Sequence, residues 1–370
     1  MDSTTTHRTG PALAQQSYTD FLTDRMARAC DALGIVRGLS RPVLREVRSL
    51  LDPWGRQPIG TRSRYPSAVS HDGFPAELSV NWSDGPPQVR ILFESLGGPM
   101  TPLSCRRAGV ALNGRLAARP GVSLDRYLKI EDLVLPSPPE PGPGLIWHSL
   151  AWTPGRSPRY KVYFSAQARG RAHSHHLVEE AMGRLGLSTA WSHVRGVLGP
   201  SEDQEHELEF LALDLSDTPR SRVKVYYRHH APTAAVLNRV AGLSGRHDSE
   251  RATAAYHRIL GDAMVRQSLP IPNEPLTCLA FLQDHDIPVE ATTYLRLPGL
   301  VGSDEEACGR VSGLMEVQGI DPAPYRSMIE SLAPGPLSQT TGLQELVSVR
   351  CGRRTPDVTL YLRFAAYPSD

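Results

Sequence analysis

The stretch Ser221-Arg222-Val223-Lys224-Val225-Tyr226-Tyr227-Arg228 decides the fold, because its side chains alternate strictly in chemical character. Val223, Val225 and Tyr227 fall on one face of an extended strand, and basic residues fall with Tyr226 on the other. Period-two alternation is typical of a β-strand with one face buried against apolar partners. The polar face is unusual, since it carries arginine, lysine, tyrosine and arginine in succession.

The same pattern recurs in four other segments, each of which is the second strand of a predicted hairpin. The five hairpins are 76–82 with 88–95, 145–152 with 159–165, 208–215 with 222–228, 276–282 with 290–297, and 343–350 with 357–364. Gly, Pro, Asp and Ser fill most of the breaks within them, as hairpin turns require.

Between the hairpins the apolar spacing becomes helical, so each unit is predicted as helix, helix, strand, strand. Helices are expected at 17–33, 41–51, 105–118, 175–185, 189–198, 234–243, 251–266, 304–316 and 322–332. Five units give an α+β fold, a ten-stranded antiparallel β-barrel surrounded by helices in five ααββ repeats. One domain is expected over residues 17–370, preceded by a polar, disordered tail over residues 1–16.

The polar face of the strands points into the barrel if the helices cover the outside. Ten strands leave a lumen wider than side chains alone fill. The alternative is an open sheet whose polar face is solvated, as antiparallel sheets often are. A tyrosine two residues after a basic residue, repeated at equivalent positions, favours the barrel, since a solvated face has no need of that repetition.

The composition excludes several classes of function. The chain has 370 residues, 40% of them hydrophobic, and a net charge of +1, which gives no electrostatic case for nucleic acid or an anionic membrane. No apolar run approaches the length of a membrane span, and the first 16 residues lack a secretory apolar region. Five scattered cysteines indicate reduced thiols in a cytoplasm. A monomer or weak homodimer is expected.

The inward basic residues and tyrosines predict a site for a highly charged anion. Pyrophosphate suits it, because many acceptor oxygens meet many fixed cations. Only three of the 40 basic residues are lysines, and two of them, Lys161 and Lys224, lie on this face. No DDxxD run is present, and Asp214 and Asp217 are interpreted as turn residues. A metal site is not expected, either there or at the histidines His173, His175 and His176.

Four strings in this order resemble the dimethylallyltryptophan synthase family of aromatic prenyltransferases. They are 75–79 (PAELS), 161–163 (KVY), Asp214 with 221–226 (SRVKVY), and 358–362 (VTLYL). The resemblance covers nearly the whole chain beyond about residue 20, and bacterial indole prenyltransferases of actinomycetes match best in length and spacing. It implies an ααββ barrel that transfers a prenyl group, usually dimethylallyl, from its diphosphate to an indole without a metal.

The resemblance also implies roles for individual residues. Glu77 matches a glutamate that accepts a hydrogen bond from the indole N–H, and its place beside Ser79 and Asn81 on the inward face agrees with that role. His148 lies near a lysine position that relatives use for proton transfer, although a packed strand histidine is the alternative. The diphosphate shell is expected to comprise Arg90, Lys161, Tyr163, Arg222, Lys224, Tyr226, Tyr294, Arg296 and Tyr361.

Two positions depart from the family pattern. Asp357 occupies a position where the family often has a second tyrosine. Glu209 is the residue nearest to the position at which fungal members have an arginine that holds the tryptophan carboxylate. The acceptor is therefore tryptophan or a derivative such as an indolactam or a cyclic peptide. Two other functions stay open: prenylation of a phenol or hydroxynaphthalene by the same fold, and a non-enzymatic barrel that binds an anionic lipid.

Overall fold

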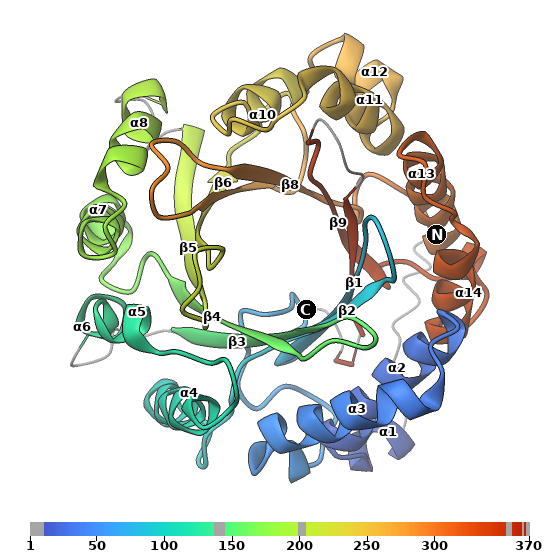
Figure 1. The fold of residues 1–370 in the computed structure, drawn as a ribbon. Helices are drawn as coiled ribbons and strands as arrows, with labels where there is room; N and C mark the ends of the chain where they lie inside the picture. Colours follow the sequence, from blue (N-terminus) through green and yellow to red (C-terminus); the bar gives the residue numbers. More distant parts are fainter. Residues whose placement is uncertain (1–10, 137–144, 199–204, 353–356, 365, 368–370) are drawn as a thin grey trace.

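The computed structural model describes residues 11–136, 145–198, 205–352, 357–364 and 366–367, and these form a closed antiparallel barrel inside a ring of helices (Figure 1). Each strand pairs with its neighbours in the chain, and β1 also pairs with β10, which closes the barrel. The strands are β1 (Ala76–Trp82), β2 (Gln88–Phe93), β3 (Ile146–Trp152), β4 (Arg159–Ser165), β5 (His206–Asp214), β6 (Val223–His229), β7 (Leu276–Phe281), β8 (Glu290–Arg296), β9 (Gln344–Val349) and β10 (Val358–Leu362).

The helices surround the barrel in the order of the chain (Figure 1). They are α1 (Pro11–Gln15), α2 (Tyr18–Ala32), α3 (Arg37–Leu51), α4 (Pro102–Ala117), α5 (Asp125–Leu128), α6 (Glu131–Val134), α7 (Ser174–Arg184), α8 (Ser188–Leu198), α10 (Ala234–Ala241), α11 (Ser249–Leu260), α12 (Asp262–Arg266), α13 (Asp304–Val317) and α14 (Ala323–Leu332). Their starts follow ordinary capping chemistry: the hydroxyl of Thr101 accepts from the backbone N–H of Ser104, and that of Ser303 accepts from Glu306.

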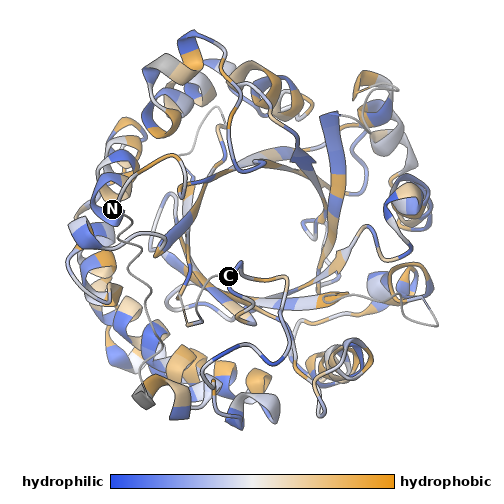
Figure 2. Cartoon of the chain, turned by 180° about the vertical axis from the view of Figure 1, so that it is seen from behind, coloured by the Kyte–Doolittle hydropathy of each residue, from blue (hydrophilic) through white to orange (hydrophobic). Residues whose placement is uncertain are grey.

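The predicted barrel is confirmed, and so is the direction of its two faces. The outward side chains of the second strands, such as Val225, Leu295 and Leu360, are fully buried beneath the helices. Figure 2 shows hydrophobic and hydrophilic residues mixed along both strands and helices, as two-faced elements require. Each fully buried Val or Leu contributes about 1.5–3 kcal/mol relative to exposure. The open, solvated sheet is therefore wrong.

Two first strands contain a β-bulge that inserts one extra residue. In β5 the pairing with β6 shifts between Leu208 and Phe210, so Glu209 is the extra residue. In β9 the pairing with β10 shifts so that Leu346 faces Tyr361 while Gln344 faces Leu362, and Glu345 is extra. A bulge re-aims a side chain relative to a regular strand. Both inserted residues are glutamates.

Several predicted details need correction. A disordered tail over residues 1–16 is wrong from residue 11 onward, because α1 forms there and the N–H of Ile59 donates to the carbonyl of Gln16. Residues 1–10 lie outside the described part. The sequence predicts one helix in the second unit, whereas α4 is followed by the short helices α5 and α6.

The tight turn of the second hairpin places Gly155 at a positive φ of 76°, where glycine carries no steric cost.

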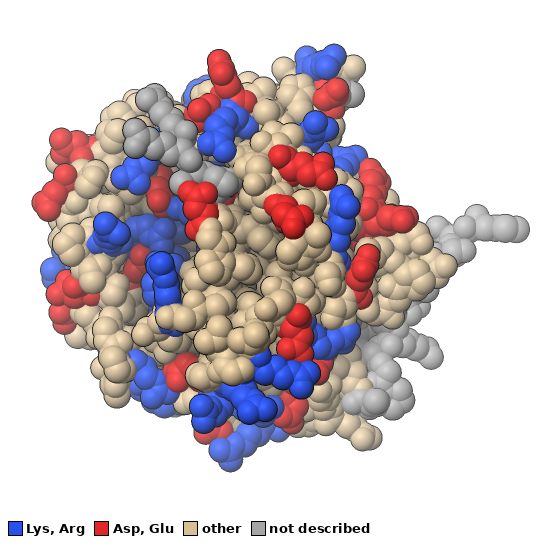
Figure 3. Space-filling view, turned by 45° about the vertical axis from the view of Figure 1, so that its right-hand side comes forward, with Lys and Arg blue, Asp and Glu red and all other residues tan. Residues whose placement is uncertain are grey.

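The surface has no unusual charge pattern on the face that Figure 3 shows, where basic and acidic side chains are interspersed. Within the described ranges, no helix combines the length and the apolar character needed to cross a membrane. All five cysteines are buried and unpaired.

Candidate active site

The lumen holds a cavity of about 1120 Å³ that opens between the hairpin turns at one end of the barrel. That volume lies above the roughly 300–1,000 Å³ typical of small-molecule sites. We call this end the mouth and the opposite end of the lumen the far end. The residues that line the cavity come from all five hairpins.

Successive hairpins advance by two residues along the barrel axis. Tyr163 faces Ala212, which in turn faces Lys224, two residues before Tyr226. Repeating this step around the barrel gives one equivalent inward position in each hairpin: Leu92, Tyr163, Tyr226, Tyr294 and Tyr361. We call the four tyrosines the tyrosine belt. The belt separates the mouth from the far end.

Two tiers of polar residues lie on the mouth side of the belt. The tier next to the belt consists of Arg90, Lys161, Lys224, Thr292 and Thr359, and the outer tier of Gln88, Arg159, Arg222, Glu290 and Asp357. All ten residues line the cavity. The first three hairpins therefore each place a cation at the same inner position. The sequence pattern predicted all three cations and Arg222.

The two lysines of the inner tier lie deep in the barrel and are only partly exposed. Burial lowers the pKa of Lys161 well below its ordinary value, and the nearby ammonium of Lys224 lowers it further. Burial also lowers the pKa of Lys224, with a further contribution from Arg222. Two crowded, buried ammonium groups favour an anion between them, because its charge restores the stability of their protonated forms.

Carboxylates alternate with these cations along the rim. Lys161 Nζ lies 3.5 Å from Asp214, and Arg222 lies 3.1 Å from Asp214 and 3.2 Å from Glu290. Arg350, at the end of β9, continues the chain of ion pairs by bridging Glu290 and Asp357. Burial alone raises the pKa of Asp214, but Lys161, Arg222 and Lys224 outweigh it and hold the pKa well below the ordinary range. Asp214 thus belongs to the site and is more than a turn residue.

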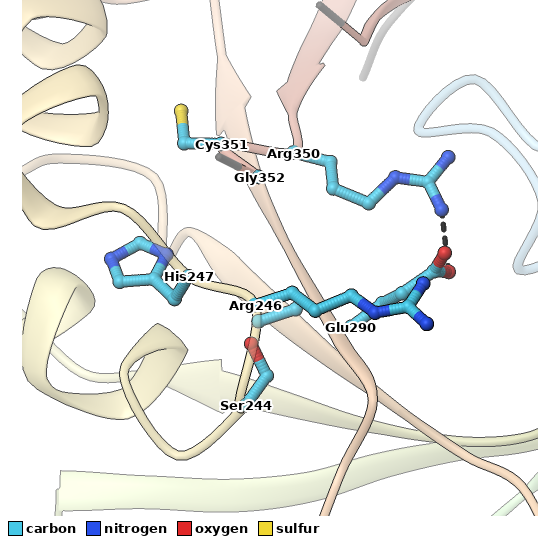
Figure 4. Close-up of a pocket in the computed structure, with 8 residues that line it drawn as sticks. Ser244, Arg246, His247, Glu290, Arg350, Cys351 and Gly352 are labelled. Carbon is cyan, nitrogen blue, oxygen red and sulfur yellow. Dashed lines mark hydrogen bonds and ion pairs between the residues drawn. The ribbon is translucent and has the colours of Figure 1, made fainter. Parts of the chain in front are cut away.

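A small pocket adjoins this rim, and its wall includes Ser244, Cys351 and Gly352. Figure 4 shows Arg246 and Arg350 reaching in the same direction, towards Glu290, with Arg350 joined to Glu290 by an ion pair. Arg246 lines both this pocket and the main cavity. The sequence pattern missed Arg246 and Arg350 because neither lies within a predicted basic-x-Tyr string.

Asp357 takes part in a local network in place of the tyrosine that the family pattern suggests. Its carboxylate accepts from Asn81 Nδ2 at 2.8 Å and pairs with Arg350. Asn81 also donates to the hydroxyl of Thr359 at 3.0 Å. The mouth is therefore more polar on this side than a second tyrosine would make it.

The tyrosine belt is continuous along one side of the lumen. Ring centroids lie 6.2 Å apart for Tyr163 and Tyr226, 5.9 Å for Tyr226 and Tyr294, and 5.7 Å for Tyr294 and Tyr361. Burial raises the pKa of each phenol, so the hydroxyls stay neutral. The belt offers π faces to a cation and excludes water from the space beside the mouth cations.

Glu77 lies on the far side of the belt. It belongs to the inward face of β1, two residues from Ser79, which faces Tyr361 across the strand pair. Burial raises its pKa to about 8, and the nearby carboxylate of Glu345 adds to the effect. A buried carboxyl in this position is suited to accept a hydrogen bond from a ligand. Trp147, whose ring centroid lies 5.4 Å from that of Phe210, provides an aromatic wall.

Arginines at the far end are engaged by glutamates. Arg228 donates to Glu209, with Nε 2.8 Å from the carboxylate, and to Glu274 at 2.9 Å. Arg296 donates to Glu345 at 2.8 Å. Arg296 was expected in the diphosphate shell, but it follows Tyr294 on β8, beyond the belt and outside the two tiers of the mouth.

His148 lies outside the lumen, so its predicted role in proton transfer is wrong. Its Nε2 is 2.8 Å from the side-chain oxygen of Asn113 on α4, and its ring packs beside Phe93 in the layer under the helices. Burial lowers its pKa to about 3, with a smaller effect from Arg115, so the ring stays neutral. The alternative of a packed strand histidine is correct.

The described residues contain no group of three or more His, Cys, Asp or Glu side chains placed to hold a metal ion. Of the histidines considered in the sequence, His175 instead pairs with Arg195.

The comparisons with known proteins agree with this geometry. A family model described as tryptophan dimethylallyltransferase matches residues 47–368. Among solved structures, a 6-dimethylallyl tryptophan synthase is 30% identical with a TM-score of 0.87, covering 96% of this chain and 99% of that one.

Two further structures are complexes with DMASPP and Trp. The 6-dimethylallyltryptophan synthase from Micromonospora olivasterospora is 31% identical with a TM-score of 0.85, over 96% of this chain and 99% of that one. The 5-dimethylallyl tryptophan synthase from Streptomyces coelicolor is 25% identical, also with a TM-score of 0.85, over 95% and 96%.

Proposed function

This chain belongs to the tryptophan dimethylallyltransferase family, and on that premise we propose which part of the lumen binds each substrate. The protein is a prenyltransferase that moves a prenyl group from its diphosphate to an indole. The non-enzymatic lipid-binding barrel is thereby set aside. The mouth binds the diphosphate, the tyrosine belt surrounds the prenyl group, and the far end holds the indole acceptor, which is tryptophan or a tryptophan derivative.

One observation carries the donor assignment: three successive hairpins place Arg90, Lys161 and Lys224 at the same inner position, directly above the belt. Arg159 and Arg222 stand behind them. A diphosphate has enough acceptor oxygens to engage several of these cations at once. Lys161 and Lys224 neutralise charge that develops on the bridging oxygen as the carbon–oxygen bond breaks, which lowers the barrier.

The reaction then proceeds between the two ends of the lumen. The bond between the prenyl C1 and oxygen breaks, and the diphosphate leaves with the electron pair. The tyrosine belt stabilises the resulting allylic cation through its π faces. A ring carbon of the indole supplies the electron pair of the new carbon–carbon bond, and the ring then passes a proton to the released diphosphate and recovers aromaticity. Glu77, once ionised, accepts the indole N–H and makes the ring a better nucleophile.

We propose that catalysis needs no metal, because fixed side chains meet the charge of the diphosphate. The test is turnover of dimethylallyl diphosphate with tryptophan in the presence of excess EDTA. Undiminished activity supports the proposal. Complete loss, restored by added Mg²⁺, rejects a metal-free diphosphate site.

A phenolic or hydroxynaphthalene acceptor is the second candidate. Glu77 argues against it, since a buried carboxylate serves an N–H donor on a ring that has no other polar atom. An assay of dimethylallyl and geranyl diphosphate against tryptophan, an indolactam, a cyclic dipeptide and a dihydroxynaphthalene distinguishes the candidates. Preference for the naphthalene over every indole would reject the indole assignment.

A further inference from the structure

The two β-bulges of the barrel each place a glutamate beside an inward-facing arginine. Each inserts a glutamate into a first strand, Glu209 in β5 and Glu345 in β9. Each glutamate binds an arginine on the inward face of a neighbouring second strand, Arg228 on β6 or Arg296 on β8. Both pairs lie on the far side of the tyrosine belt, where the acceptor is proposed to bind.

The two glutamates differ in how many of their carboxylate oxygens accept a hydrogen bond. Arg228 reaches both carboxylate oxygens of Glu209. Arg296 reaches only Oε1 of Glu345, and among the described residues no donor reaches its Oε2. His71 Nε2 is 3.6 Å from the same Oε1. The side chain of Glu345 is 9% exposed, so water does not readily replace the missing donor.

A buried carboxylate oxygen without a donor is costly, roughly 1–3 kcal/mol and more for a charged group. Structures rarely retain such a group unless a bound molecule satisfies it. Glu77 is a second buried carboxyl close enough for Glu345 to raise its pKa. The far end thus presents two buried carboxyl groups that can accept hydrogen bonds, and its Arg228 is already occupied by Glu209 and Glu274.

We propose that Oε2 of Glu345 receives the primary ammonium group of a tryptophan-like acceptor while Glu77 receives its indole N–H; this rests on the proposed function. Tryptophan and tryptamine carry both donors on one molecule. Arg296 is a positioning residue, because it holds Oε1 and leaves Oε2 without a donor. The site therefore selects a free amine, and it disfavours acceptors whose amine is acylated or closed into a ring, such as a cyclic dipeptide.

The ammonium also helps the neighbouring carboxyl. A positive charge placed beside Glu77 favours its ionised form. Glu77 in the ionised form is the stronger acceptor for the indole N–H. Binding of the amine and activation of the ring are in this way linked.

The test compares four acceptors with dimethylallyl diphosphate: tryptophan, tryptamine, indole-3-propionic acid and N-acetyltryptophan. The first two have the ammonium and the last two lack it. We expect kcat/KM to be about 10- to 100-fold higher for tryptophan than for indole-3-propionic acid, as for a charged hydrogen bond. Tryptamine should keep most of the tryptophan value, because the amine is recognised and the carboxylate is not.

The variant Glu345→Gln removes the charge and keeps the shape. We expect it to reduce the ratio between tryptophan and indole-3-propionic acid to within about threefold, mainly by raising KM for tryptophan. Glu316→Gln is the control, because it loses the same charge on the exposed surface of α13, where Arg326 lies 3.6 Å away, and should keep the wild-type ratio. An unchanged ratio in Glu345→Gln overturns the proposal.

The wild-type acceptor series keeps the proposal testable if Glu345→Gln does not fold. Equal activity on tryptophan and indole-3-propionic acid rejects the ammonium site and leaves the prenyltransferase function standing. If none of the four acceptors is prenylated, although the dimethylallyl diphosphate is intact and the protein is folded, the result counts against the proposed indole acceptor instead. The two failures are therefore distinguishable.

Discussion

Lys224 illustrates what one residue contributes to this site. Burial lowers its pKa and Arg222 adds to the effect, whereas Asp214 opposes it; an anionic ligand would favour the charged form further. We expect Lys224→Ala to reduce kcat by about 10²–10³-fold, the usual loss when one preorganised group for a developing negative charge is removed. The measurement is steady-state turnover, with circular dichroism to show that the barrel remains folded.

Lys129→Ala is the control for that experiment. Lys129 is exposed near α5 and away from the lumen, so its removal should leave turnover within about twofold. Lys224→Arg is also expected to be impaired, because a planar guanidinium does not occupy the space of a compact ammonium. Full activity in Lys224→Ala would remove this lysine from the mechanism.

Glu77 predicts the pH dependence of the acceptor reaction. Its pKa is raised to about 8, so the carboxyl is protonated below that pH and ionised above it. Since the ionised form accepts the indole N–H, kcat/KM for the acceptor should rise through about pH 8 and then level off. Glu77→Gln should lose this rise and lower kcat/KM by about 10- to 100-fold at pH 9. A wild-type profile that is flat from pH 6 to 9 contradicts the role.

Individual residues also show where sequence reasoning stops. Arg90, Lys161 and Lys224 were predictable because strict alternation assigns each of them to the inward face. Glu345 was not, since the bulge that turns it inward leaves no mark in the strand pattern. Asp214 was read as a turn residue because its partner Lys161 is 53 residues away, a contact that only the strand pairing creates.

At the scale of elements, the tyrosine belt has a testable task. If its π faces protect the allylic cation from water, loss of one ring should divert part of the reaction to hydrolysis. We expect Tyr361→Leu to slow prenylation by up to about 30-fold, the upper range of a desolvated cation–π contact, and to raise the yield of dimethylallyl alcohol. Chromatography of both products from one reaction gives the ratio.

Tyr361→Phe is the control for this experiment. The phenylalanine keeps a π face and loses only the hydroxyl, which is hydrogen-bonded to Ser348. Prenylation with little alcohol is expected from it. Equal hydrolysis in the leucine and phenylalanine variants would show that the ring itself does not shield the cation.

The strands differ in how well the sequence predicts which of their faces is buried. The second strands alternate between exposed or half-buried and buried residues, as β4 does along its whole length. β3 is buried on both faces, with Trp147 in the lumen and His148 under the helices. A polar residue on the helix side is possible there because Asn113 supplies a partner. The role expected for His148 came from the family resemblance, which does not fix the face of the strand on which its side chain lies.

At the scale of the whole molecule, closure of the barrel depends on β10. Leu360 faces Val80 in β1 and Val347 in β9, so one residue takes part in both final ladders. Leu360→Pro removes a backbone donor and a packed side chain at that point and should destabilise the fold by more than about 3 kcal/mol. Leu360→Ile conserves volume and should cost less than about 1.5 kcal/mol. Thermal melting of the soluble fraction compares them.

The five-fold repeat made the whole-molecule architecture the most predictable level. Ten strands with one apolar face have to bury that face under helices, and closure follows because it leaves neither end of the sheet unpaired. The division of the lumen was less predictable. It depends on the two-residue advance between hairpins, which only the observed register reveals.

The pairing of β1 with β10 has a consequence for how the chain is made. Asn81 and Asp357 are separated by 276 residues, yet they are hydrogen-bonded across the seam of the barrel. On a ribosome, β1 therefore waits with an open edge while nearly all the remaining strands are synthesised, and such edges recruit other strands. A slow or stalled translation of the last hairpin should consequently yield aggregates rather than partly active enzyme.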